Sequence, residues 1–290
     1  MAISKRVKGA LNGASWVRRM FEVGDELKRV YGEENVYDFS LGNPNLEPPP
    51  SLKKALKELA DNPVAGMHRY MPNNGYIETR RTIAEYLKEE SGLPFTENHV
   101  VMTVGAAGGL NVTFKALLDE GDEVIVPSPY FMEFKFYIDN NGGKIHLVET
   151  NEDFSLNLKE IEKAISERTK AILINSPNNP TGVIYSHESL EKLGQLLKRK
   201  SQELGRTIYL ISDEAYRRIV YDGIKLPISF RYYPHTIRVT SHSKDLSLPG
   251  ERIGYIAVST LCEEAGELVG ALVFSNRILG FVNAPALMQR

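Results

Sequence analysis

One lysine in this sequence stands where it could do covalent chemistry. Lys244 closes a Ser-His-Ser-Lys segment that begins at Ser241, directly after the predicted strand of residues 237–240. An amine that is partly desolvated at the edge of a sheet has a lowered pKa, and the neutral form can then form an imine. Most lysines are solvated surface groups, so position alone predicts only a candidate nucleophile.

Asp213 is a candidate acidic residue, because it directly follows another apolar run, residues 208–212. A carboxylate at a buried strand end costs free energy unless it meets a cation or a protonated partner. The alternative is a helix N-cap for a segment that begins at Glu214, and both interpretations are open at this point.

A glycine-rich segment, Gly-Ala-Ala-Gly-Gly at residues 105–109, leads into a predicted helix at residues 110–118. Small side chains leave backbone N–H groups accessible at a helix N-terminus, and such groups bind anions such as phosphate. A plain tight turn explains the same glycines. The spacing matches neither the dinucleotide-binding fingerprint nor the P-loop, so neither of these sites is predicted.

Two further segments follow predicted strands. Asn179 lies in the Asn-Asn-Pro-Thr-Gly turn of residues 178–182, and most turns of this composition only reverse the chain. Tyr130 follows a Pro-Ser-Pro segment and could present its ring to a flat ligand, although an aromatic residue at such a place more often packs into the core.

All of these residues follow short β-rich runs that alternate with helical segments. The runs cover residues 100–104, 123–127, 144–148, 171–175, 208–212, 237–240 and 255–258. Such alternation predicts an α/β fold, in which helices cover both faces of a mostly parallel sheet. Ligands of open α/β sheets bind at the carboxyl ends of the strands, where the residues above are expected to meet.

The N-terminal part of the chain has a different pattern. Apolar residues at helical spacing, from Trp16 to Leu27, predict an amphipathic helix. An irregular connection rich in Gly, Asn and Pro follows at residues 37–50. We therefore predict an N-terminal arm or small-domain segment at residues 1–45 and a large domain at residues 46–290.

The composition is that of an ordinary soluble protein, with 42% hydrophobic and 25% charged residues. The 35 basic and 37 acidic side chains nearly cancel, which gives no electrostatic argument for nucleic acid or an anionic membrane as a partner. Cys262 is the only cysteine, so no intrachain disulfide forms and a reducing, cytoplasmic location is expected. A catalytic thiol is a weaker interpretation. We find no signal peptide and no membrane-spanning segment.

Seven segments of the sequence resemble class I/II aminotransferases of the pyridoxal 5'-phosphate (PLP) fold type I, of which aspartate aminotransferase is an example. In chain order they read LGNPN, HRYMPNNGYIETR, VGAAGGLN, PSPYF, NSPNNPTG, SDEAY and SHSKDLSLPGERIGY. Order and spacing agree with the family over nearly the whole chain, and the last segment is the most specific. The resemblance implies a three-layer αβα PLP-transferase large domain.

The resemblance also implies a role for each candidate residue. Lys244 would hold PLP in a Schiff base and move a proton between the substrate Cα and the cofactor, while Asp213 would pair with the pyridinium nitrogen. Asn179 and Tyr216 would hydrogen-bond the phenolic oxygen of PLP. Tyr130 would stack on the face of the ring.

The phosphate of PLP would be held by residues from three segments. They are the backbone amides of Ala106 and Ala107, the hydroxyls of Ser241 and Ser243, and the guanidinium of Arg252. Tyr70 matches a tyrosine that reaches the phosphate from the neighbouring subunit, which implies a homodimer. Gly42 and Asn179 would lie at the substrate, whereas His242 has no implied role.

Family members continue beyond the length of this chain into a C-terminal small domain, which supplies the arginine that binds the substrate α-carboxylate. We therefore expect a C-terminally truncated chain that keeps the PLP-binding residues but transaminates weakly or only binds PLP. The favoured reaction transfers an amino group between an L-amino acid and a 2-oxo acid such as 2-oxoglutarate. Aspartate is the favoured amino acid, and aromatic amino acids or alanine are alternatives.

Other functions use similar parts. C–S lyases and aminocyclopropane-carboxylate synthases share the cofactor site, because a fold does not determine the reaction. A PLP-sensing regulator would need a DNA-binding module ahead of the core, and a dinucleotide-dependent enzyme would need its glycine fingerprint. The sequence alone predicts no metal site.

Overall fold

The structure is a computed structural model. It describes residues 2–39 and 42–290, without the side chains of residues 12–18 and 21. The Trp16 side chain, used above to predict a helix, and Leu41 of the LGNPN segment lie outside the described residues. The chain divides into the units Met1–Asn45 and Leu46–Arg290. The roles assigned to them, an arm and a PLP-binding domain, stay predictions.

The unit Met1–Asn45 consists mainly of the predicted helix, α1 (Lys5–Tyr31). The Ser4 side chain caps the first turn by accepting a hydrogen bond from the Val7 amide at 3.2 Å. Lys28 Nζ lies 2.8 Å from Asp38 Oδ2, and this ion pair holds the following segment against the helix.

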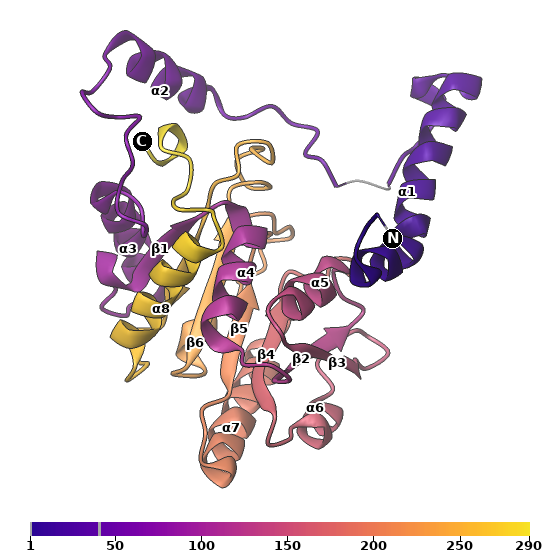
Figure 1. Cartoon of the computed structure of the whole chain (residues 1–290), viewed down its shortest axis with the longest axis vertical. Coiled ribbons are helices and arrows are strands. Elements are labelled where there is room, and N and C mark those ends of the chain that lie inside the picture. Colours follow the sequence, from indigo (N-terminus) through magenta and orange to yellow (C-terminus); the bar gives the residue numbers. More distant parts are fainter. Residues whose placement is uncertain (1, 40–41) are drawn as a thin grey trace. The chain divides into compact units, whose positions relative to one another are not determined.

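The unit Leu46–Arg290 is built on a sheet whose seven described strands lie in the order β1-β7-β6-β5-β4-β2-β3 (Figure 1). The strands are β1 (Val100–Thr103), β2 (Glu123–Ser128), β3 (Lys144–Glu149), β4 (Thr169–Asn175), β5 (Tyr209–Asp213), β6 (Thr236–Ser241) and β7 (Gly254–Val258). Each predicted run is a strand, with ends that differ by one or two residues.

Most neighbouring strands run parallel, as predicted. β2 pairs in parallel with β3 and β4, and the parallel pairing continues through β5 to β6. Only β7 runs the other way, antiparallel to both β6 and β1. The carboxyl ends of β1, β4, β5 and β6 therefore lie at one edge of the sheet.

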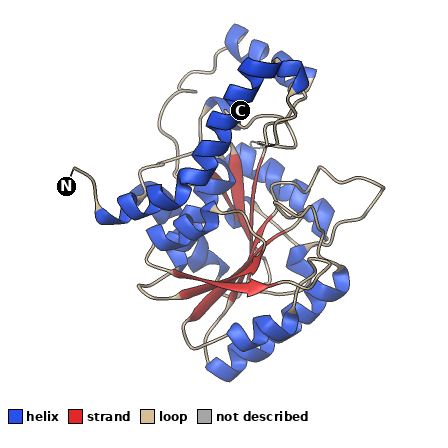
Figure 2. Cartoon of the chain, turned by 90° about the vertical axis from the view of Figure 1, so that its right-hand side faces the viewer, coloured by secondary structure: helices blue, strands red, loops and turns tan. Residues whose placement is uncertain are grey.

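Helices cover both faces of the sheet (Figure 2). Ala171 and Leu173 of β4 join one hydrophobic core, whereas Ile172 and Ile174 join another on the opposite face. The first face is covered by α4 (Gly105–Leu117), α5 (Glu133–Asn140) and α8 (Ala265–Ile278). The second is covered by α3 (Ile77–Ser91), α6 (Leu158–Ala164) and α7 (His187–Leu204). The predicted three-layer αβα fold is confirmed.

The remaining described α-helix is α2 (Pro50–Asp61), which follows the irregular connection. Proline is favoured at the first position of a helix, where its missing N–H has no partner to lose. Among the described residues, none of the helices combines the length and the apolar character that crossing a bilayer requires.

One element boundary was wrong in the prediction. α4 begins at Gly105, not at residue 110. A Cβ on Gly108 would lie 2.4 Å from Val104 Cγ2, and one on Gly109 would lie 2.7 Å from Val239 Cγ1. Both glycines belong to the helix: Gly108 leaves room for the Val104 side chain that precedes it, and Gly109 lets the helix lie close against β6, while Ala106 falls in the first turn.

Candidate active site

A cavity of ≈ 190 Å³ lies at the edge of the sheet where β4, β5 and β6 end and α4 begins. Nine of the residues selected from the sequence line it: Ala106, Ala107, Asn179, Asp213, Tyr216, Ser241, Ser243, Lys244 and Arg252. Phe131, Phe134, Tyr137 and Asn175 also line it and were not selected. The parallel strands explain the convergence, because their carboxyl ends share one edge.

Asp213 is the last residue of β5 and is buried in the cavity wall. Burial raises the pKa of its carboxyl group to about 7, the Ala215 amide opposes this, and the Glu214 carboxylate adds to it. No cation among the described residues contributes to this pKa. The chain after Asp213 is a turn, so the helix N-cap interpretation was wrong, although the Ala215 amide still donates to Asp213 Oδ1 at 3.4 Å.

Lys244 lines the same cavity from the turn after β6. Burial lowers the pKa of its amine, and the positive charge of Arg252 lowers it further. His242 shapes this turn, because its amide donates to Ile253 O at 3.0 Å and its Nδ1 lies 3.1 Å from Asp245 Oδ2. The turn therefore presents a lysine whose pKa is shifted toward the neutral, nucleophilic form.

Asn175, the last residue of β4, links two neighbouring strand ends. Its Nδ2 donates to Asp213 O at 3.0 Å, and its Oδ1 accepts a hydrogen bond from the Asn179 amide at 2.7 Å. The Asn179 side chain hydrogen-bonds the Tyr216 hydroxyl, whose pKa is raised by burial and by the Asp213 carboxylate. Sequence reasoning missed Asn175, although its place at the end of an apolar run was an available signal.

The N-terminus of α4 faces the cavity through the small residues Ala106 and Ala107. Ser241 and Ser243 line the same cavity and are buried. Helix N-terminal amides and serine hydroxyls are donors for phosphate oxygens. This side of the cavity fits an anion.

Arg252 adds a positive charge beside the start of α4. Its Nη2 donates to Val104 O at 3.3 Å and its Nη1 to Pro249 O at 2.9 Å. Gly105 has a φ of +73°, and a Cβ there would lie 2.6 Å from Arg252 Nη2. Glycine at this position therefore keeps room for a guanidinium next to the helix N-terminus.

Three residues with implied roles lie elsewhere. Tyr130 is partly buried against the core on the α4 side of the sheet, and Phe131 beside it lines the cavity. Tyr70 is 90% exposed. Gly42 belongs to the unit Met1–Asn45. The roles of Tyr130, Tyr70 and Gly42 stay predictions.

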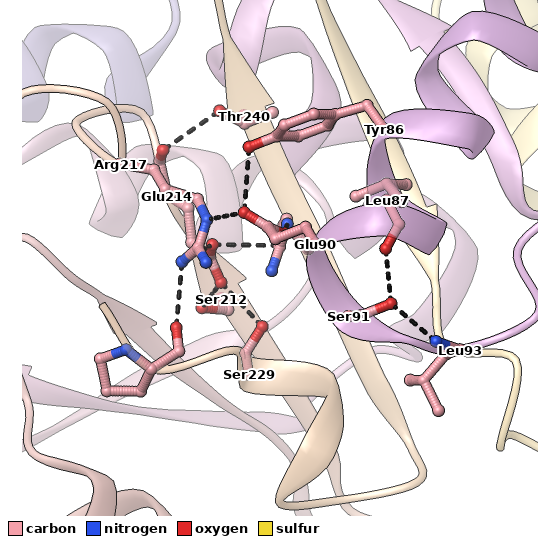
Figure 3. A network of polar contacts seen from close by, with 12 residues as sticks. Tyr86, Leu87, Glu90, Ser91, Leu93, Ser212, Glu214, Arg217, Ser229 and Thr240 are labelled. Carbon is pink, nitrogen blue, oxygen red and sulfur yellow. Dashed lines mark hydrogen bonds and ion pairs between the residues drawn. The ribbon is translucent and has the colours of Figure 1, made fainter. Parts of the chain in front are cut away.

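Glu214, next to Asp213, lies in a buried network of charges and hydroxyls (Figure 3). Its Oε2 lies 3.0 Å from Arg238 Nε and 3.1 Å from Arg217 Nη1. Its Oε1 accepts hydrogen bonds from Ser212 Oγ at 2.8 Å and Ser229 Oγ at 2.7 Å. Both oxygens of this carboxylate are therefore satisfied by the protein itself.

Glu90 of α3 completes the network (Figure 3). Its carboxylate lies 2.6 Å from Arg217 Nε and 2.5 Å from Arg238 Nη1. Although burial opposes it, the charges of Arg238 and Arg217 lower the pKa of Glu90 to about 2. Because Arg238 is on β6, the network ties α3 to the two strands that carry Asp213 and Ser241.

Cys262, the alternative nucleophile, lies at the opposite end of the sheet. It follows β7, whose last residue, Val258, pairs with Ile237 at the start of β6. Burial raises the pKa of its thiol to about 11. A thiol that stays protonated is a poor nucleophile, so a catalytic role gains no support.

Similar proteins support the chemistry that the residues of the cavity suggest. Residues 34–289 match the profile of the family described as aminotransferase class I and II. A probable aspartate/prephenate aminotransferase from Aquifex aeolicus is 36% identical over 245 residues, which cover 82% of this chain and 59% of that protein. A probable aspartate aminotransferase from Methanocaldococcus jannaschii is 30% identical over 236 residues, covering 81% of this chain and 60% of that protein.

A solved structure is also similar to this chain. The crystal structure of an aminotransferase from Eubacterium rectale matches with a TM-score of 0.95 and 41% identity, and the match covers 100% of this chain and 73% of that one. The chain spans about 60% of the length of the curated relatives named above. The aspartate aminotransferase-like family depends on PLP, and the residues around the cavity suit that cofactor. This chain belongs to the aminotransferase class I and II family.

Proposed function

We propose that this chain provides the PLP site of an aminotransferase, which moves an amino group between an L-amino acid and a 2-oxo acid. The observation that carries the proposal is that Asp213 and Lys244 line one cavity: the buried Asp213 carboxylate meets no cation among the described residues, and the pKa of Lys244 is lowered. A cationic ring that carries an aldehyde would suit both residues, because its charge would meet the Asp213 carboxylate and its carbonyl carbon the Lys244 amine.

Asp213 is the partner for the pyridine nitrogen of PLP. When bound, PLP supplies a protonated ring that accepts electron density from the substrate's α-carbon. A cation against Asp213 would lower the pKa of its carboxyl group from about 7 and keep it ionised. The buried carboxylate would in return keep the ring nitrogen protonated.

Lys244 is the covalent anchor and the proton carrier. Its lowered pKa leaves more of the amine neutral, and the neutral amine would hold the cofactor at its carbonyl carbon, with loss of water; when free of the cofactor, the same Nζ would accept the proton of the substrate α-carbon. Asn179 and Tyr216, which already contact each other, would donate to the phenolic oxygen of the cofactor. Tyr130 would lie against its ring.

The phosphate is assigned to the anionic end of the cavity. The first-turn amides of α4 at Ala106 and Ala107 would donate to it, together with the hydroxyls of Ser241 and Ser243. Arg252 would neutralise its charge, because a guanidinium matches phosphate oxygens in charge and shape.

The proposed amino donor is aspartate, with 2-oxoglutarate as the acceptor. Both curated relatives described above are named as aspartate aminotransferases, and one also as a prephenate aminotransferase. Gly42 and Asn179 are the residues of this chain that we assign to the substrate. Aromatic amino acids and alanine are the alternatives.

We propose a cytoplasmic homodimer as the working assembly. Tyr70 is 90% exposed, which leaves its hydroxyl available to the phosphate site of a second subunit. The single cysteine, Cys262, suits a reducing compartment.

The experiment is a titration of the protein with PLP, followed by borohydride reduction and peptide mass mapping. Wild type should gain a visible absorbance band and carry a pyridoxyl mass on the peptide that contains Lys244. Lys244→Ala should lose both. Lys170→Ala, which changes a partly buried lysine on β4, is the matched control and should behave as wild type.

Two outcomes would contradict the proposal. One is a pyridoxyl mass on a different lysine, and the other is an unchanged band in Lys244→Ala. Once the covalent site is located, adding aspartate, tyrosine or alanine to the loaded protein tests the substrate, since the preferred amino acid should change the cofactor band at the lowest concentration.

A further inference from the structure

Three possible metal ligands meet at the end of the sheet opposite the cavity. His235 Nδ1 and Cys262 Sγ lie 3.6 Å apart, and both lie 3.6 Å from Glu264 Oε2. An imidazole nitrogen, a thiol sulfur and a carboxylate oxygen are the three donor types that zinc accepts in proteins. Among the described residues, this group of His, Cys and acidic side chains is close enough together to hold an ion.

We propose that His235, Cys262 and Glu264 bind a divalent zinc ion. Zinc bonds of about 2.0 to 2.3 Å at tetrahedral angles place neighbouring ligand atoms roughly 3.3 to 3.6 Å apart. All three separations in this chain are 3.6 Å. One ion can therefore reach bonding distance of all three atoms after side-chain shifts of a few tenths of an ångström.

The fold brings these ligands together although they are distant in sequence. His235 precedes β6, and Cys262 and Glu264 lie in the turn between β7 and α8. The antiparallel pairing of β6 with β7, and a hydrogen bond from the Ser259 amide to Thr236 O at 3.0 Å, place the two segments side by side. The ligands are thus positioned by backbone contacts that do not depend on the ion.

Backbone hydrogen bonds already hold each of the three ligand residues, and for Glu264 the bond is from the Leu268 amide to Glu264 O at 2.9 Å. The Leu210 amide donates to His235 O at 3.0 Å, and the Cys262 amide donates to Ser259 O at 3.2 Å. The Ala265 amide donates to Cys262 O at 3.2 Å and fixes the start of α8. Pre-positioned ligands reduce the ordering cost of binding.

The environment leaves one coordination position for a fourth ligand. Cys262 is 5% exposed, whereas the Glu264 side chain is 47% exposed. An ion held by the three side chains would therefore meet solvent on the Glu264 side and take a water there. By binding the folded chain and cross-linking β6 to the turn before α8, the ion would stabilise this end of the sheet.

Cobalt(II) is the sharpest probe of this site. The chelator-treated 290-residue protein is titrated with Co²⁺ and then with Zn²⁺, while absorbance and metal content are measured. Because Cys262 is the only cysteine, any thiolate-to-cobalt charge-transfer band must come from it. We expect one ion per chain, intense visible bands of tetrahedral cobalt, loss of both signals on adding Zn²⁺, and a higher thermal midpoint with zinc.

Variants separate the ligands from their neighbours. Cys262→Ser should remove the charge-transfer band, and Cys262→Ser, His235→Gln and Glu264→Gln should each weaken zinc binding by about 100-fold or more, beyond the usual cost of changing a residue that only supports a ligand. Glu264→Gln changes a half-exposed side chain, so it tests the site even if Cys262→Ser folds poorly. Glu263→Gln and His146→Gln, on exposed neighbouring and distant side chains, are the matched controls.

The proposal is overturned by either of two results. One is cobalt binding without a thiolate band in the wild type. The other is zinc affinity in Glu264→Gln and Cys262→Ser that equals that of the Glu263→Gln control. Neither result would bear on the PLP site, because the two sites share no residue.

Discussion

Asp213 and Glu214 are consecutive carboxylates at the end of β5 that have opposite surroundings. Glu214 is matched by two guanidinium groups and two hydroxyls. Asp213 receives a single long hydrogen bond from a backbone amide, and its pKa is raised to about 7. The Glu214 amide donates to Val239 O at 2.9 Å and so continues the pairing one residue beyond β5; side chains that alternate between the two faces therefore enter different environments.

The difference separates a structural charge, Glu214, from the charge that we propose to be functional, Asp213. Both oxygens of Glu214 are partnered by the protein itself, so its network holds α3, β5 and β6 together without help from a ligand. The cavity around Asp213 is incomplete, because its buried carboxylate has no cation of the described chain beside it. Strongly perturbed groups in a cavity are typical of functional sites.

The largest expected effect comes from breaking the network of charges around Glu214. Arg238→Met removes a fully buried cation and leaves Glu90 and Glu214 without one of their partners. We expect the free energy of unfolding to fall by about 3 to 5 kcal/mol, as for other buried pairs that lose one member. Urea unfolding measures this.

A surface ion pair is the control for that prediction. Arg81 pairs with Glu97 at 3.1 Å but is 57% exposed, so Arg81→Met should cost about 1 kcal/mol or less. If the two substitutions cost the same, the network is not the structural element described above.

The second prediction concerns Asp213 and the pH dependence of the free energy of unfolding. In PLP-free protein between about pH 4 and 7, the folded state keeps a proton on Asp213 that the unfolded chain has lost, because the folded pKa is raised from 3.8 to about 7. The free energy of unfolding therefore falls as pH rises through this window, by up to about 4 kcal/mol. Asp213→Asn should remove that loss and be more stable than wild type at pH 8.

Unfolding of the wild type and Asp213→Asn in urea at pH 5 and pH 8 checks this. Repeating it with PLP should reverse the order at pH 8, since the cofactor would stabilise only the wild type strongly. If the free energies of unfolding of the two proteins changed equally with pH in the absence of PLP, the pKa of Asp213 would not be raised in the folded state.

The smallest predicted effect lies at the anion end of the cavity. Gly105→Ala places a Cβ at a positive φ and 2.6 Å from Arg252 Nη2. The backbone strain should cost roughly 1 to 3 kcal/mol of stability. Displacing Arg252 should also weaken PLP binding about tenfold, the cost of one charge-assisted hydrogen bond.

Gly121→Ala is the matched control for strain. Gly121 has a φ of +89°, and no atom would lie within 4 Å of an added Cβ. It should lose similar stability but keep its PLP affinity, as measured by fluorescence titration. Equal PLP affinities in the two variants would remove Arg252 from the phosphate site.

Much of the fold was determined by the sequence itself. Residues 171–175 and 208–212 are nearly all apolar because these strands are buried on both faces, and such runs identify strands without any knowledge of their neighbours. The order of the seven segments also predicted the family. Such motifs are visible in the sequence because particular side chains are required at particular strand ends.

Tertiary structure alone decided which groups find partners. Asp213 and Glu214 are adjacent carboxylates in the sequence, and they are separated by the turn that brings Arg217 back to Glu214 and by the placement of Arg238 and Glu90 on other elements. The start of α4 was misplaced because glycine disfavours helices locally, whereas close packing against Val239 requires it. The meeting of His235 with Cys262 and Glu264 depends on the antiparallel pairing of β6 and β7, and strand pairing is a long-range property that no local pattern encodes.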